Sequence, residues 1–121
     1  MTTKGIKPDK IIGDDIPRGN KVNVIKGDGE AGTVFVDGHY LSPRDSQKIY
    51  NHSPDGFAWG YGGSGPAQLA LAILMEFTSV TKEVHLYQDF KSEHVARWPM
   101  GKDFEVKIDI AGWIKNKTNK K

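Results

Sequence analysis

A glycine-rich turn before an apolar segment is the first place in this chain where backbone atoms could do chemistry. Gly62, Gly63, Ser64 and Gly65 lead into Pro66. The first N–H groups of a helix have no partner inside the helix, so such a turn can bind a phosphate or a carboxylate. However, Pro66 donates no N–H, and no lysine follows the turn as it does in phosphate-binding loops. The favoured alternative is a tight strand–helix corner, in which the glycines adopt positive φ and Ser64 caps the turn.

Aromatic side chains precede this turn and could hold a flat ligand. Tyr50, Phe57, Trp59 and Tyr61 are candidates for stacking on a nucleobase. Phe57, Trp59 and Tyr61 alternate with small residues, which predicts a strand with three aromatic side chains on one face. Such a face is more often part of the core than a ligand platform. Trp59 and Tyr61 each have a polar tip that suits the edge of a pocket.

Polar side chains around the turn are the remaining candidates. His52 could contact a ligand or act as an acid–base group, and Asp55 could pair with it or cap the local turn. A turn-stabilising role is favoured because no nucleophile motif accompanies them. Arg44 and Lys48 could neutralise a phosphorylated ligand, and Gln68 completes a corner that runs from His52. The histidines lack the spacing of a metal site, so we expect neither a metal nor a cofactor.

The elements that must position these side chains are strands and two helices. Short runs of strand-forming residues between glycine turns predict strands at residues 22–25, 33–36 and 39–41. A helix is predicted from Pro66 to about residue 78, with Gly65 as its cap. Its interior has no polar residue, so it is either the central core helix or part of an oligomer interface.

The C-terminal half predicts a second helix and a last strand. The helix begins at residue 87 or 89 and runs to about residue 98, with Phe90, Val95 and Trp98 toward the core. Residues 104–110 alternate apolar and charged side chains, as a half-exposed strand does. We expect a flexible arm at residues 1–20, a single domain at 21–114 and a basic, disordered tail at 115–121.

The bulk composition is that of one soluble domain. The chain has 121 residues, no cysteine and a formal net charge of +2. It therefore has no disulfide, and its mildly basic balance does not by itself indicate nucleic acid. The apolar run from residue 69 to 75 is shorter than the roughly 20 residues that span a bilayer. We expect no signal peptide, no membrane contact and a cytoplasmic location.

The stretch HSPDGFAWGYGGSGPAQLALAIL, at residues 52–74, carries a family resemblance. It resembles the signature of a small uncharacterised domain family of phages, prophages and other mobile elements. The resemblance is specific over residues 51–76 and extends weakly through Phe90 to Trp113. It implies a mobile-element setting, in which small proteins often regulate host processes or counter host defences. No activity follows from it.

These observations lead to one fold and several functions. We expect an α+β domain, with a small antiparallel sheet packed on one central apolar helix and a second, shorter helix beside it. The leading hypothesis is a non-enzymatic phage or mobile-element protein that counters host defence at the corner from His52 to Gln68. It would bind a host protein there or sequester a phosphorylated nucleotide. The alternatives are a nucleic-acid-binding protein that uses the lysine tail and the aromatics, a structural protein that forms homo-oligomers, and an enzyme that uses His52 and Asp55.

Overall fold

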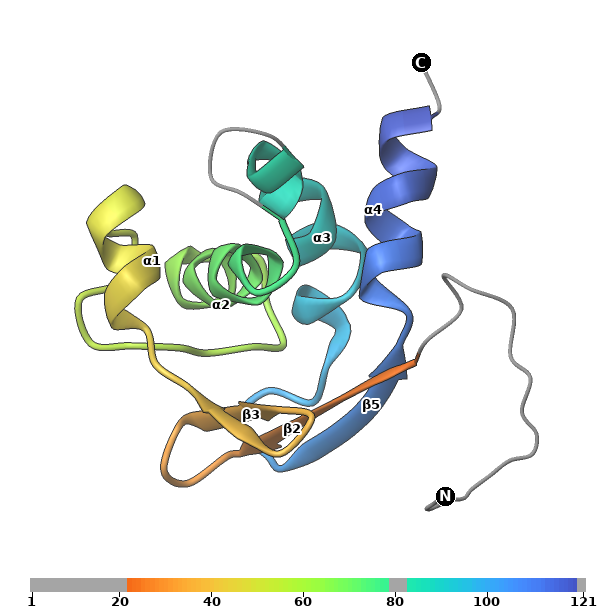
Figure 1. The fold of residues 1–121 in the computed structure, drawn as a ribbon. Helices are drawn as coiled ribbons and strands as arrows, with labels where there is room; N and C mark the ends of the chain where they lie inside the picture. The colour runs from red at the N-terminus through yellow and green to blue at the C-terminus, as the bar shows by residue number, and fades with distance from the viewer. Residues whose placement is uncertain (1–21, 79–82, 120–121) are drawn as a thin grey trace.

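The structure is a computed structural model that describes residues 22–78 and 83–119. Four antiparallel strands form one sheet in the order β4-β3-β2-β5 (Figure 1). Tight turns join the first three along the chain, whereas β5 returns from the C-terminal part to pair with β2. The α+β class is confirmed. The strands are β2 (Asn23–Asp28), β3 (Thr33–Val36), β4 (His39–Leu41) and β5 (Phe104–Ile108).

The helices lie over one face of this sheet (Figure 1). Ile25 is paired with Val36 on one side and with Val106 on the other, and this row points toward the helices. The opposite face carries exposed side chains, and no element of the described chain covers it. The helices are α1 (Arg44–Ile49), α2 (Ser64–Met75), α3 (Tyr87–Glu93) and α4 (Ile110–Asn119), with short 3₁₀ turns at Glu83–Leu86 and Val95–Arg97.

Helix α2 is the centre of the core, as its composition predicts. All ten residues from 65 to 74 are buried, because the sheet lies on one side and α1 and α3 lie on others. Burying each of its Leu and Ile side chains contributes about 1.5–3 kcal/mol. Residues 65–74 therefore offer no exposed apolar face for an oligomer interface. The helix begins two residues earlier than expected and ends at Met75, and Gly63 rather than Gly65 is its cap.

The aromatic segment before α2 is not a strand, so that prediction is wrong. Residues 57–61 pair with no strand of the described chain, and the burial of their aromatic rings differs: Trp59 is buried and Tyr61 is exposed. Gly60 turns the chain with a φ of 91°, and its N–H donates to the carbonyl of Val95 at 3.0 Å. The positive φ expected at Gly62–Gly65 is thus found at Gly60 instead.

The C-terminal segment also differs from expectation, because β5 ends at Ile108 and α4 continues to Asn119. Residues 115–119 are therefore helical rather than a disordered tail. Asp109 starts the helix by accepting a hydrogen bond from the N–H of Gly112 at 2.9 Å, as a capping carboxylate does. Ile110 and Ile114 then bury one face of the helix. The predicted arm at residues 1–20 lies outside the described residues.

Candidate functional site

Gln68 holds the predicted corner together from inside the core. Its side chain is 0% exposed. The amide oxygen accepts hydrogen bonds from the N–H groups of His52 at 2.7 Å and Ser53 at 2.9 Å. The amide nitrogen donates to the hydroxyl of Ser46 at 2.9 Å and to the carbonyl of Tyr50 at 3.0 Å. Both polar ends of Gln68 are therefore committed to the chain's own backbone and side chains.

His52 is also committed to internal contacts. Its Nε2 lies 2.7 Å from the hydroxyl of Tyr87, and its ring forms a cluster with Tyr50 and Tyr87 at centroid distances of 5.9 and 5.5 Å. Asp55 sits in the turn that the N–H of Gly56 closes onto the carbonyl of Ser53. Within residues 22–78 and 83–119, no hydrogen bond joins His52 to a carboxylate, as an acid–base pair would require.

The start of α2 is where the structure places the glycine-rich turn. Tyr61 folds back over it: a Cβ added at Gly63 would lie 2.5 Å from the Tyr61 ring, and one at Gly65 would lie 2.6 Å from the Cβ of Ala58. These glycines are therefore required for close packing. Gly62 and Ser64 are exposed, and the helix has no side-chain cap. The ring of Tyr61, rather than open solvent, faces the Gly63 and Gly65 side of the helix start.

The two basic candidates lie on α1 rather than on the glycine turn. Asp45 and Ser46 of α1 lie beside Ala72 and Met75 of α2, and Ser46 also accepts the hydrogen bond from Gln68. Arg44 begins α1, and its backbone N–H donates to the hydroxyl of Ser42 at 3.2 Å. The ammonium of Lys48 lies 3.8 Å from its helix neighbour Asp45, and both side chains are exposed.

An apolar cleft opens beside the aromatic segment, and we call it the glycine cleft. Its volume is about 180 Å³. Trp59 forms its buried wall, since the indole donates to the carbonyl of Lys102 at 2.9 Å and packs edge-on against Phe104. Tyr61 and Met100 stand at the mouth, 43% and 63% exposed. The lining residues come from three separate parts of the chain: Gly29, Gly32, Phe57, Ala58, Trp59, Tyr61, Met100 and Gly101.

Two glycine turns that are distant in sequence form one side of this cleft. Asp28 holds the first turn by accepting hydrogen bonds from the N–H groups of Glu30 and Ala31 at 3.0 and 3.1 Å. Asp103 ties the second turn to the first by accepting from the N–H of Gly29 at 2.8 Å. A Cβ at Gly29 would lie 2.5 Å from the backbone of the second turn, so the two turns touch. The carboxylates of Asp28 and Asp103 are therefore bonded to the turn that supplies Gly29 to the cleft.

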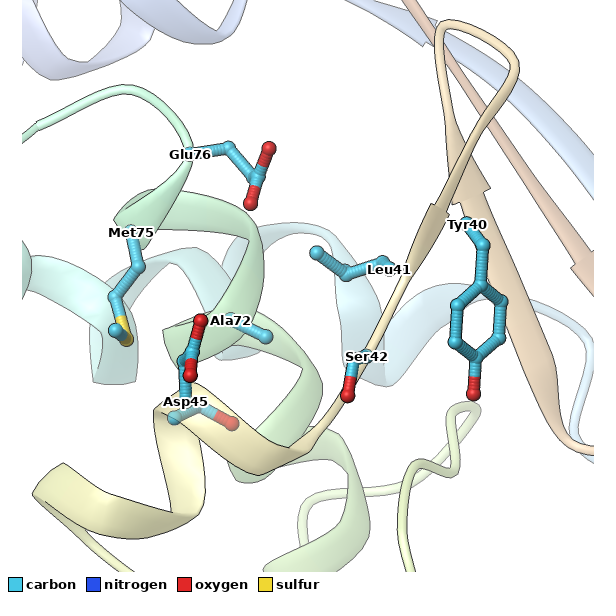
Figure 2. Close-up of a pocket in the computed structure, with 8 residues that line it drawn as sticks. Tyr40, Leu41, Ser42, Asp45, Ala72, Met75 and Glu76 are labelled. Atoms are coloured by element: carbon cyan, nitrogen blue, oxygen red, sulfur yellow. The ribbon is translucent and has the colours of Figure 1, made fainter.

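A second hollow lies at the other end of α2, and we call it the polar hollow. Its volume is about 230 Å³. Figure 2 shows Asp45 and Glu76 approaching it from α1 and from the end of α2, with Leu41 across from them. Two carboxylates near a helix C-terminus favour cations. Among the described residues, however, no group of three His, Cys, Asp or Glu side chains could hold a metal ion. The sequence offered no motif for this hollow.

Charged side chains on α3 and α4 form a separate network that docks the last helix. Lys117 pairs with Asp89 and Glu93, and the indole of Trp113 donates to Glu93 at 2.9 Å. The hydrogen bond from Lys117, followed by that from Trp113, lowers the pKa of Glu93, and the same carboxylate raises the pKa of Lys117. Burial lowers the pKa of His94, which packs against Phe90. This network is structural.

The sheet and the central helix define a small α+β protein, and the glycine cleft opens on its surface. The chain belongs to a family of unknown function, DUF6166, whose family model matches residues 18–116. This agrees with the expected small uncharacterised domain. Searches of curated proteins and of solved structures found no significant match. None of the helices in the described ranges is long and apolar enough to cross a membrane.

Proposed function

We propose that this is a non-enzymatic binding protein whose glycine cleft takes an apolar side chain from a partner protein. One observation carries the proposal: Tyr61 and Met100 remain largely exposed around an apolar cleft of about 180 Å³. Exposed apolar groups that gather around a hollow are typical of interaction sites. Aromatic residues and methionine are also the types enriched in protein interfaces.

The size of the cleft supports a side chain rather than a nucleotide. An engineered cavity of about 150 Å³ binds benzene, whereas pockets for small molecules typically measure about 300–1,000 Å³. The cleft, at about 180 Å³, suits one aromatic ring or one large aliphatic group. The nucleotide version of the hypothesis has less support, because Tyr61 packs against the start of α2 and none of the described residues that line the glycine cleft is a lysine or an arginine.

The internal hydrogen bonds of the polar candidate residues further support a binding role. Gln68 and His52 spend their hydrogen bonds on the chain itself, and the indole of Trp59 does the same. The indole bond of Trp59 holds one wall of the glycine cleft in place before a partner arrives. A preformed site lowers the entropic cost of association.

The nucleic-acid alternative has less support. Lys115 and Lys117 lie on a helix, and Lys117 is paired with acidic side chains of α3. Phe35 and Tyr40 form an exposed edge-to-face pair on the uncovered sheet face, but neighbouring charges there have both signs, as in the pair of Lys26 with Glu105. Such a face lacks the one-signed potential that phosphates require.

The setting of this proposal is a phage or other mobile element, with the protein in the host cytoplasm and a host protein as its partner. That setting rests on the resemblance of residues 51–76. Countering host defence is the corresponding biological role. None of these points affects the physical test of the cleft.

The test is selection from a library of random displayed peptides against the purified protein. We expect the enriched peptides to share an aromatic or large aliphatic residue. Their affinity should fall about tenfold or more for Tyr61→Ser and for Met100→Ser, as for truncated hot-spot contacts. Tyr40→Ser is the matched control, because this exposed tyrosine lies on the sheet face away from the cleft. Absence of enrichment, or equal affinity for all variants, would overturn the proposal.

A further inference from the structure

We infer that the segment that enters the glycine cleft is a basic peptide, with lysine or arginine next to its apolar anchor. The inference rests on the proposed function of the cleft and adds the charge of its partner. It follows from the electrostatics of the two glycine turns, which supply Gly29, Gly32 and Gly101 to the lining.

Carboxylates border these turns. Asp28 and Glu30 flank Gly29 along the chain, with Cα atoms about 3.8 Å from it. Asp103 reaches the same residue, since its carboxylate accepts the N–H of Gly29 at 2.8 Å. All three acidic residues are exposed. A cation on a bound peptide that came to lie beside Gly29 would feel all three carboxylates, because the Debye length is about 8 Å.

Positive charges on the two glycine turns are fewer than these carboxylates. Lys102 carries the one ammonium on the two turns, at residues 28–32 and 99–103. The start of α2, beside Tyr61, adds only the partial positive charge of a helix N-terminus. Three carboxylates against one ammonium leave a net negative rim. This rim attracts a basic segment and repels an acidic one.

Glu30 is the acidic residue that can be changed without disturbing the turns. Asp28 and Asp103 hold backbone N–H groups through their carboxylates, whereas only the backbone of Glu30 takes part in these bonds. Glu76 is its matched control: it is an exposed glutamate that borders the polar hollow at the other end of α2.

The experiment uses three synthetic peptides with the same tryptophan anchor, flanked by lysines, by serines or by glutamates. Binding to the full chain is measured by isothermal titration at about 0.05 M and about 0.5 M salt. We expect the lysine peptide to bind most tightly and to lose its advantage at high salt. Glu30→Lys should weaken the lysine peptide by about two- to fivefold, whereas Glu76→Lys should not.

The outcomes separate this inference from the proposed function. If all three peptides bind equally, or the glutamate peptide binds best, the charge inference is overturned while the cleft proposal stands. If Tyr61→Ser leaves the binding of the serine peptide unchanged, or that peptide does not bind at all, the cleft proposal itself fails. An equal effect of Glu30→Lys and Glu76→Lys would also contradict a local role for the rim.

Discussion

Replacing Gln68 with leucine should destabilise the protein more than its small change in volume suggests. The amide of Gln68 accepts two backbone N–H groups and donates to a backbone carbonyl and to the hydroxyl of Ser46. A leucine fills the same space inside α2 but offers no polar atom. The N–H groups of His52 and Ser53 and the carbonyl of Tyr50 then lose this partner.

The size of the effect follows from these groups. A buried polar group without a partner costs about 1–3 kcal/mol. His52 and Ser53 are half-buried, so water can reach them in part, and the lower end of that range applies. Ser46 keeps its hydrogen bond to the carbonyl of Pro43. Three groups at about 1 kcal/mol each lower the free energy of unfolding by roughly 3 kcal/mol, which corresponds to a fall in Tm of about 10 °C.

Urea unfolding followed by tryptophan fluorescence measures this difference directly. Gln88→Leu is the matched control, because Gln88 lies exposed on α3 and its substitution should change stability by less than about 0.5 kcal/mol. If Gln68→Leu and Gln88→Leu unfold at the same urea concentration, the four hydrogen bonds of Gln68 do not hold the corner, and the reasoning is wrong.

Two further predictions concern a glycine and a histidine. Gly60→Ala should lower the free energy of unfolding by about 2 kcal/mol or more, because its φ is 91° and a Cβ would lie 2.4 Å from the backbone of Met100. Gly62→Ala, where a Cβ meets nothing, should change it by about 0.5 kcal/mol or less in the same urea titration. Burial lowers the pKa of His94 below its usual value of 6.5. The contribution of the buried neutral imidazole to the free energy of unfolding is therefore complete above pH 6.5 and is lost as the pH falls below that value. His94→Gln should remove this part of the pH dependence of the urea midpoint, and an unchanged profile would contradict it.

Local sequence patterns predicted the strands and helices that depend mainly on residues close to them in the sequence. The strand at Thr33–Val36 is encoded by a short β-branched and aromatic run between glycine turns, and α2 by an apolar run that begins near a proline. Alternation of aromatic and small residues failed at residues 57–61, since a period of two does not reveal whether a partner strand is available. Helix α4 was missed because its lysines and asparagines hid the helical spacing of Ile110, Trp113 and Ile114.

The candidate site was predictable only in part, because some of its residues come from distant parts of the chain. Trp59 and Tyr61 were chosen for their aromatic rings, and both line the glycine cleft. Met100 and the turn at Gly29 complete it from distant parts of the chain, where no local motif marks them. The contact that joins the turns, from Asp103 to Gly29, spans 74 positions. A single sequence contains no pattern that signals such proximity.

The place of β5 in the sheet has a consequence for how the protein is made. Strand β2 lies between β3 and β5, yet its pairing with β5 needs a part of the chain that leaves the ribosome well after β2 and β3. The bond from the N–H of Ile110 to Asn23 likewise closes a loop of 87 positions. Until then one edge of β2 stays unpaired, and open strand edges favour aggregation during synthesis. The sheet should therefore be completed only after β5 has left the ribosome, with a rate limited by loop closure.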